Sequence, residues 1–139
     1  DTFKGCSSLE SIVVADGNPV FDSREGCNAI IETTTNTLIK GCKTTVIPNS
    51  VTKIQFDAFK GCTSLESIAI PNSVTWIGED VFSGCTSLTT LRLDNCSNDT
   101  INKIITRLPT FTSGTHKIYC KEANAQGLTA PSGWVFSYV

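Results

Sequence analysis

The seven cysteines are the side chains best suited to chemistry, because thiolates act as nucleophiles, bind zinc and form disulfides. Four of them follow a glycine within a recurring motif, namely Cys6, Cys42, Cys62 and Cys85. A zinc site needs ligands that converge in pairs, and the sequence has no C-x-x-C. We expect these four thiols to be free, buried in one column and engaged in packing. A disulfide or metal role for the column is the alternative.

The other cysteines and the single histidine offer less. Cys96 and Cys120 both follow predicted strands and could meet in a disulfide, whereas Cys27 has no evident partner. His116 precedes Cys120 by four residues, which on a strand places both side chains on one face but about 13 Å apart. That separation is too large for a nucleophile and its base. We expect His116 to be a surface histidine.

Acidic residues on predicted turns do not form a catalytic pair. The four candidates are Asp22, Glu25, Glu79 and Asp80. Nothing in their spacing sets two of them across a cleft, as a general acid and base require. The sequence also lacks the G-x-x-x-x-G-K-[ST] loop that cradles phosphates. We therefore expect no catalytic site, no cofactor and no metal.

The elements that position these residues come from an internal repeat. Residues 59–65 recur as residues 82–88, and the lead-in at 48–52 recurs at 71–75, both at a step of 23 residues. Such a period predicts a leucine-rich-repeat solenoid, mainly β, in which each unit buries its apolar face against the next. Within a unit, Leu65, Ile68 and Ile70 should point inward on a short parallel strand, with Ser67 and Ala69 outward. The next extended segment, 74–77, should return before Phe82 fills the interior.

Residues 18–40 interrupt the repeat. Two β-prone runs, 28–32 and 37–39, flank a turn-like stretch at 33–36 and predict a β-hairpin. The repeat resumes at Gly41, but the distance from Cys42 to Pro48 is three residues shorter than that from Cys62 to Pro71. Thr45 also stands where the next repeat has Ile68. We expect this repeat to be the weakest in the stack.

Residues 95–139 predict a closing unit that covers the last repeat. An apolar helical face follows from the spacing of Ile101, Ile104, Ile105 and Leu108. Asn98 or Asp99 should cap the helix, and Pro109 should stop it. Strands are expected at 116–120 and 135–138. We expect Trp134 to pack against the apolar face of the helix.

The pattern F-x-G-C-[ST]-S-L-x-x-[IL]-x-[IL]-P-N-S-V-T-x-I resembles the BspA-like leucine-rich repeats of surface proteins from gut and oral anaerobes. The resemblance covers Phe3–Val14 and Val46–Leu93, and the hairpin and the closing unit, with its Gly133-Trp134, are also similar to this family. It implies an exported, non-enzymatic module that takes part in adhesion to host proteins or other cells. A structural spacer without a ligand is the alternative.

One glycosylation motif coincides with the predicted helix start. Asn98-Asp99-Thr100 is an N-glycosylation sequon, and Asp99-Thr100-Ile101 resembles the O-glycosylation acceptor of gut anaerobes. Asn98 and Thr100 are therefore candidate sugar sites. The alternative is that these residues only cap the helix.

Composition limits the architecture and the partners. The 139 residues predict one domain, divided into a partial first repeat (1–17), the hairpin insertion (18–40), repeats (41–94) and the closing unit (95–139). Because the first motif lacks its lead-in, we expect a piece of a longer array. A net charge of −2 and 17% charged residues argue against nucleic acid and anionic lipid as partners. No apolar run is long enough for membrane insertion.

The outward residues of the repeat strands are the candidate binding face. They mix charged, hydroxyl and small apolar side chains, which suits a protein or glycan surface. The candidates are Glu10, Ser11, Val13, Lys43, Thr44, Val46, Glu66, Ser67, Ala69, Thr89, Thr90 and Arg92.

Overall fold

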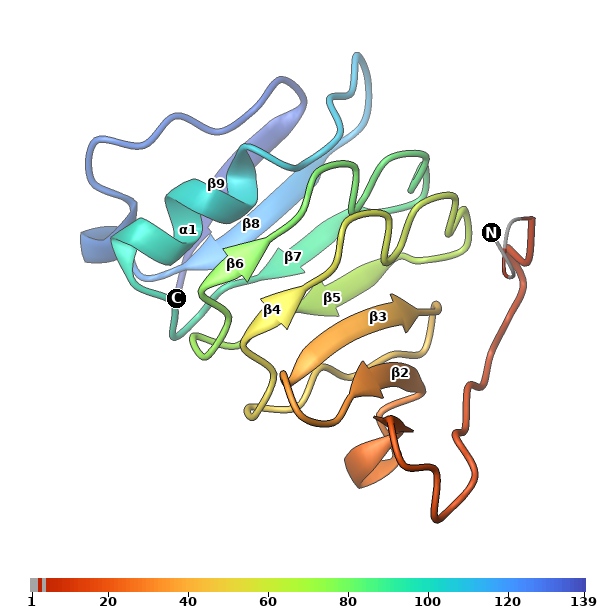
Figure 1. Ribbon diagram of the computed structural model, residues 1–139. Coiled ribbons are helices and arrows are strands. Elements are labelled where there is room, and N and C mark those ends of the chain that lie inside the picture. The colour runs from red at the N-terminus through yellow and green to blue at the C-terminus, as the bar shows by residue number, and fades with distance from the viewer. Residues whose placement is uncertain (1–2, 4) are drawn as a thin grey trace.

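The computed structural model describes residues 3 and 5–139 and contains two β-sheets and one α-helix (Figure 1). Residues 1, 2 and 4, which belong to the predicted first repeat, lie outside the described residues. The first sheet, called sheet A, has five strands in the order β1-β2-β3-β4-β6. Their bounds are β1 (Phe21–Asp22), β2 (Ala29–Glu32), β3 (Thr37–Gly41), β4 (Lys53–Ile54) and β6 (Trp76–Ile77).

The second sheet, called sheet B, has four strands in the order β5-β7-β8-β9, and all of its pairs are parallel. Its strands are β5 (Ser67–Ala69), β7 (Thr90–Arg92), β8 (His116–Cys120) and β9 (Trp134–Tyr138). Ile68 pairs with Leu91, and in sheet A Ile54 pairs with Ile77. Both pairs are separated by the 23-residue step, so successive repeats lie side by side in register.

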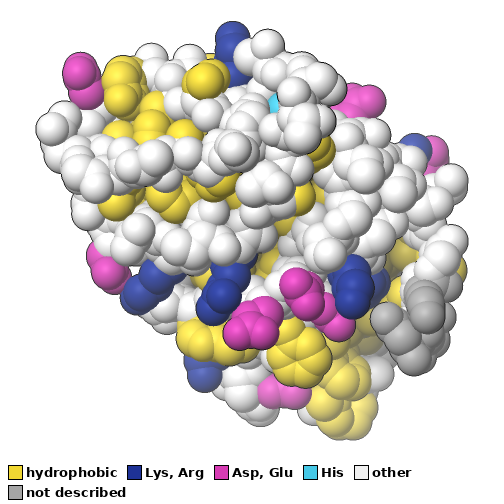
Figure 2. Space-filling view, turned by 90° about the horizontal axis from the view of Figure 1, so that it is seen from above, with side chains coloured by type: hydrophobic (Ala, Val, Ile, Leu, Met, Phe, Trp, Pro, Cys, Tyr) yellow, Lys and Arg dark blue, Asp and Glu magenta, His cyan; other side chains and the backbone are white. Residues whose placement is uncertain are grey.

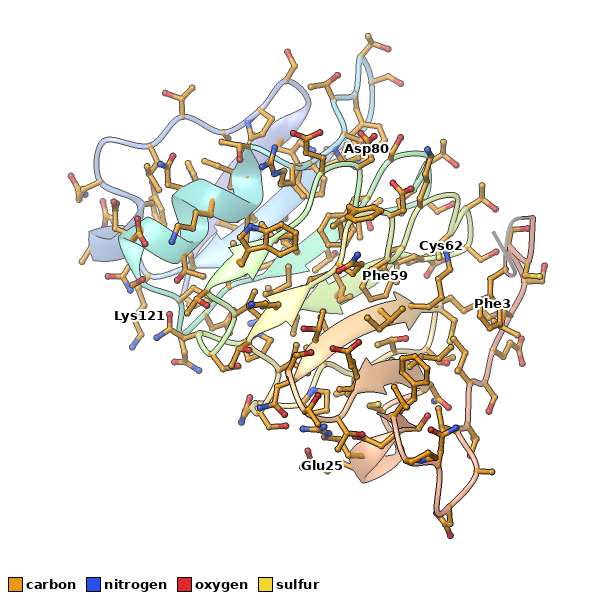
Figure 3. The ribbon with its side chains drawn as sticks, in the orientation of Figure 1. Phe3, Glu25, Phe59, Cys62, Asp80 and Lys121 are labelled. Carbon is orange, nitrogen blue, oxygen red and sulfur yellow. The ribbon has the colours of Figure 1, made fainter. Side chains whose placement is uncertain are left out.

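One hydrophobic core joins the two sheets. The predicted alternation in β5 is confirmed, since Ile68 is buried between the exposed Ser67 and Ala69. Phe59 and Phe82 occupy the same place in successive repeats, are fully buried, and stack with ring centroids 5.7 Å apart. Figure 3 shows the Phe59 ring among the strands of the stack. The repeated phenylalanine therefore fills the interior as predicted.

The predicted hairpin is confirmed, because β2 and β3 are antiparallel and joined by a turn at 33–36. The strand β1 adds to its outer edge. The structure differs from the prediction at the boundary of the insertion, because β3 also pairs parallel with β4, with Leu38 opposite Ile54. The second strand of the hairpin is thus part of the repeat stack. The other edge of β3 pairs with β2, so the first repeat does not pair with β3.

This arrangement corrects the prediction for Cys6, which is exposed, whereas Cys42, Cys62 and Cys85 are buried and free as expected. A column requires each thiol to lie on a neighbouring repeat. Because β1 and β2 occupy the edge of the stack, Cys6 lies outside it. Figure 1 shows this N-terminal segment running alongside the stacked strands.

The helix α1 (Asn98–Ile105) buries Ile101, Ile104 and Ile105, as the spacing predicted. Its cap is Ser97 rather than Asn98 or Asp99, because the Ser97 hydroxyl accepts a hydrogen bond from the Thr100 N–H. The helix contacts β6 and the short 3-10 helix η2 (Glu122–Ala125). A second 3-10 helix, η1 (Arg24–Gly26), lies between β1 and β2. The closing unit thus holds one α-helix, as expected.

His116 is buried, with 6% of its surface exposed, so the prediction of a surface histidine is wrong. Its Nδ1 lies 2.7 Å from the Leu88 carbonyl oxygen, and its ring stacks on Phe111 at 3.7 Å between centroids. Strand alternation does place His116 and Cys120 on one face of β8, but that face is the core side. The Trp134 ring is also buried beside Phe111 and His116, at 5.9 and 5.3 Å. It reaches the segment after α1 through Nε1–H, which donates to the Pro109 carbonyl at 2.7 Å.

Candidate functional site

The outward side of sheet B carries the central part of the predicted binding face. The parallel register places Ser67 beside Thr90 and Ala69 beside Arg92. Ser67, Ala69 and Arg92 are exposed and Thr90 is half-buried. Because the backbone of both strands is held by the parallel pairing, this part of the face is preformed, and a partner would order few side chains on binding it.

The N-terminal candidates lie elsewhere. Glu10, Ser11 and Val13 are exposed on a segment that forms no strand. Glu10 is tied to the repeat stack by an ion pair with Lys43, whose Nζ lies 2.8 Å from Oε1, and by its carbonyl, which accepts from the Thr44 hydroxyl. The Lys43 ammonium, by hydrogen bond and charge, holds the pKa of the Glu10 carboxyl below its usual value. These residues border the face without extending its strands.

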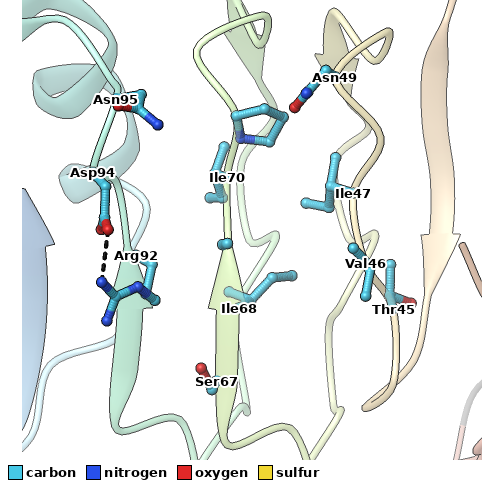
Figure 4. Close-up of a pocket in the computed structure, with 12 residues that line it drawn as sticks. Thr45, Val46, Ile47, Asn49, Ser67, Ile68, Ile70, Arg92, Asp94 and Asn95 are labelled. Atoms are coloured by element: carbon cyan, nitrogen blue, oxygen red, sulfur yellow. Dashed lines mark hydrogen bonds and ion pairs between the residues drawn. The ribbon is translucent and has the colours of Figure 1, made fainter.

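A cavity of about 470 Å³ opens on this face, between β5 and the segment Thr44–Ile47 of the preceding repeat (Figure 4). Four of the predicted residues line it: Val46, Ser67, Ala69 and Arg92. Val46 is 72% exposed, whereas Ile47, Ile68 and Ile70 are buried and form an apolar floor. The cavity thus has an apolar base and a polar mouth, the combination found in binding sites for organic ligands.

One end of the cavity is polar. The Arg92 Nη2 lies 2.6 Å from the Asp94 Oδ2 (Figure 4). The Arg92 guanidinium also lies 4.6 Å from the centroid of the Tyr119 ring. Asp94 therefore neutralises Arg92 locally, and Tyr119 holds its plane. Asn49 and Asn95 complete this end. Sequence reasoning missed these asparagines and Asp94. The repeat offered a signal, because Asp94 occupies the turn position of Pro48 and Pro71, and Asn49 and Asn95 each follow that position.

Sequence reasoning also missed two exposed aromatic residues, Trp76 on β6 of sheet A and Phe56 in the turn after β4. Trp76 and Phe56 are 47% and 55% exposed. Trp76 borders a second cavity of about 410 Å³, which Lys53 and Gln55 also line. The repeat pattern could have indicated that Trp76 is exposed, because Trp76 occupies the outward position at which the preceding repeat has Lys53. The face seen in Figure 2 mixes exposed hydrophobic side chains with charges of both signs.

The buried thiols are placed for packing. Cys85 Sγ lies 3.1 Å from the Phe59 carbonyl oxygen, and Cys96 Sγ lies 3.2 Å from that of Ile70, so each thiol donates to the preceding repeat. Burial raises the pKa of the Cys85 thiol to about 12 and that of Cys96 to about 11. Such thiols carry almost no thiolate at neutral pH and are poor nucleophiles. The disulfide considered between Cys96 and Cys120 is not formed, because both are free in the structure.

The remaining candidates have structural partners. The Arg24 guanidinium donates to both carboxylate oxygens of Asp22 at 2.8 and 2.7 Å, and holds the pKa of that carboxyl well below its usual range. The Asn98 amide donates to the carbonyls of Asn124 and Gln126 at 3.1 and 3.0 Å. Thr100 is only 8% exposed, so its hydroxyl is covered in the folded chain. Asp22 is thus paired with Arg24. Of the two candidate sugar positions, Asn98 is exposed with its amide hydrogen-bonded, and Thr100 is buried.

Residues 3 and 5–139 contain no group of three or more histidine, cysteine, aspartate or glutamate side chains that could hold a metal ion. Within the same range no helix has the length and apolar character needed to cross a membrane.

The fold defines a repeat protein built from short parallel strands, with its candidate site on one strand face. The family model of the BspA type leucine rich repeat region (6 copies) matches residues 38–113, which is more than half of the chain. The chain therefore belongs to the BspA-type leucine-rich-repeat family. Repeat domains of this kind generally mediate protein interactions and are typically not enzymes. No curated protein and no solved structure gives a significant match.

Proposed function

We propose that this chain is a non-enzymatic binding module that recognises a protein or glycan on host or neighbouring cells through the outward side of sheet B. In this proposal the stacked repeats form a short solenoid whose strand face is the recognition surface. The observation that carries it is the 470 Å³ cavity in the middle of the predicted binding residues. The surrounding side chains are neutral or paired, which suits a protein or glycan better than a polyanion.

Family membership supports a proposed cellular location. BspA-like repeat proteins are typically at the cell surface or secreted, and we propose the same for this chain. Hydroxyl side chains and a low charged fraction of 17% fit an exported surface. One such face is small beside a standard interface of about 800 Å² per partner, so we expect weak binding by a single module.

The test is retention of host extracellular-matrix and mucin components on the immobilised protein. Val46→Glu and Arg92→Glu place new negative charge on either side of the cavity and should each reduce retention about tenfold, because burial of an unpaired carboxylate costs more than 1 kcal/mol. Thr35→Ala, on the hairpin turn, is the matched control and should bind as the unchanged protein does. Circular dichroism establishes that all three variants remain folded.

Two outcomes contradict the proposal. If the Thr35 variant loses binding and the two face variants keep it, the hairpin is the recognition element. If the unchanged protein retains nothing, the chain is a structural spacer, which is the alternative that the sequence left open.

A further inference from the structure

The backbone ladder of sheet B is interrupted beside β5. Between β5 and β7 the Thr90 N–H donates to the Glu66 carbonyl at 3.2 Å, and the Ile70 N–H donates to the Arg92 carbonyl at 3.0 Å. The equivalent bonds one repeat earlier would run from Ser67 to the Lys43 carbonyl and from Ile47 to the Ala69 carbonyl. In the described part of the chain, no backbone hydrogen bond joins residues 43–47 to β5.

The ladder is interrupted because residues 44–47 of the shortened repeat bond to the hairpin and not to β5. The Thr45 hydroxyl donates to the Asn28 carbonyl at 2.6 Å, and the Val46 N–H donates to the Cys27 carbonyl at 3.1 Å. Both bonds hold the Thr44–Ile47 segment against the base of the hairpin. In β5, Ile68 occupies the position of Thr45 and has no hydroxyl to make such a bond. The 470 Å³ cavity occupies the space where the ladder would have continued.

Strand alternation determines which groups face this space. The Ile70 N–H and the Glu66 carbonyl both bond to β7. Because backbone groups alternate in direction along a strand, the N–H and C=O groups of Ser67 and Ala69 point the opposite way, toward the cavity. The Ile47 N–H and the Thr45 carbonyl are the corresponding groups on the other wall. Donors and acceptors therefore recur at every second residue along β5, about 6.6 Å apart.

We propose that this cavity binds an extended peptide segment of a partner protein, which adds to the free edge of β5 as a parallel strand. The proposal rests on the binding role proposed for sheet B and names the kind of ligand. An extended backbone offers donors and acceptors at the spacing of Ser67 and Ala69, which is the basis of strand addition. The floor of Ile47, Ile68 and Ile70 accepts an aliphatic side chain of the peptide. A charged side chain is not required, because Asp94 neutralises Arg92.

The repeat itself supplies the probe. β5 is the strand that precedes β7 by one repeat, so a peptide with the sequence of residues 65–70 should add to β5 as β5 adds to β7. The peptide is acetylated and amidated, and backbone amide exchange of the protein is followed by NMR. In the free protein the amides of Ser67 and Ala69 should exchange about 100-fold faster than that of Ile70. Peptide at about ten times its Kd should slow them about tenfold and leave Ile70 unchanged.

Two N-methylated peptides are the matched controls. In the peptide, the residues copied from Ile68 and Ile70 should turn their N–H groups toward β5, whereas those copied from Ser67 and Ala69 should turn theirs away. Methylation of the N–H groups copied from Ile68 and Ile70 should abolish the protection of the protein amides. Methylation of those copied from Ser67 and Ala69 should preserve it. Equal protection by both peptides would show that backbone pairing does not hold the ligand, and would overturn the proposal.

Three further results would also overturn it. They are slow exchange of Ser67 and Ala69 in the free protein, no protection at millimolar peptide, and protection of the same amides by mucin oligosaccharides but not by the peptide. The last result would assign the cavity to a sugar. The binding role proposed for sheet B and the peptide site can fail separately. Protection by the peptide without retention of matrix components refutes only the proposed host targets. Retention without peptide protection refutes only the peptide site.

Discussion

Replacement of Trp134 by alanine should destabilise the closing unit strongly, because this ring is 4% exposed and lies between Phe111, His116 and Pro109. Loss of a buried tryptophan side chain costs about 3–5 kcal/mol through lost transfer energy and the cavity left behind. The substitution also removes the donor to the Pro109 carbonyl, which is worth about 1 kcal/mol. We expect a total loss of about 4–6 kcal/mol in the free energy of unfolding.

Urea denaturation followed by circular dichroism measures this loss. With an m-value of about 2 kcal/mol per molar, the midpoint of unfolding should fall by about 2–3 M. Trp134→Phe keeps most of the ring packing and removes the hydrogen bond, so it should cost only about 1–2 kcal/mol. Trp76→Ala is the control, because this ring is 47% exposed, and it should cost less than about 1 kcal/mol.

The comparison has a clear negative outcome. A loss below about 1 kcal/mol for Trp134→Ala would mean that the ring does not seal the core. Equal losses for Trp134→Ala and Trp76→Ala would refute the assignment of one ring to the interior and the other to the surface.

Three more predictions concern the repeats and the hairpin. In the native protein a thiol reagent should titrate Cys6 alone, with the six buried thiols reacting only in denaturant; a native reaction at other positions would contradict the burial. Gly41→Ala should cost about 1–3 kcal/mol in urea denaturation, because its Cβ would lie 2.2 Å from Phe59 Cε1, and an unchanged midpoint would refute this close packing. The carboxyl of Asp22 has a folded-state pKa below its unfolded value, so its contribution to stability is present above about pH 4 and is lost as pH falls. Asp22→Asn should therefore lower stability at neutral pH and leave a weaker dependence on pH below about 4, whereas an unchanged acid profile would show that the ion pair with Arg24 is not coupled to folding.

The candidate site illustrates how far the sequence could be read. The missing three residues before Pro48 and the polar Thr45 marked the repeat in which the backbone ladder of sheet B is interrupted, whereas its low stability stays a prediction. Nothing local indicated that Thr45 would bond to Asn28 and Val46 to Cys27, because these partners lie on the inserted hairpin. The cavity follows from those long-range bonds. A repeat pattern therefore located the irregularity but could not describe its shape.

The sequence by itself determined what depends on local periodicity and on the 23-residue step. The inward face of Ile68, the register of Ile68 with Leu91, the hairpin and the helix all follow from spacings within a few residues or between equal positions of the repeat. Only the tertiary structure decided which face of β8 meets the core, and hence that His116 is buried. It also decided that β2 occupies the edge of β3 and leaves Cys6 outside the column. Alternation along a strand is a property of its own backbone, whereas the neighbour of each face or edge is set by chain segments distant in sequence.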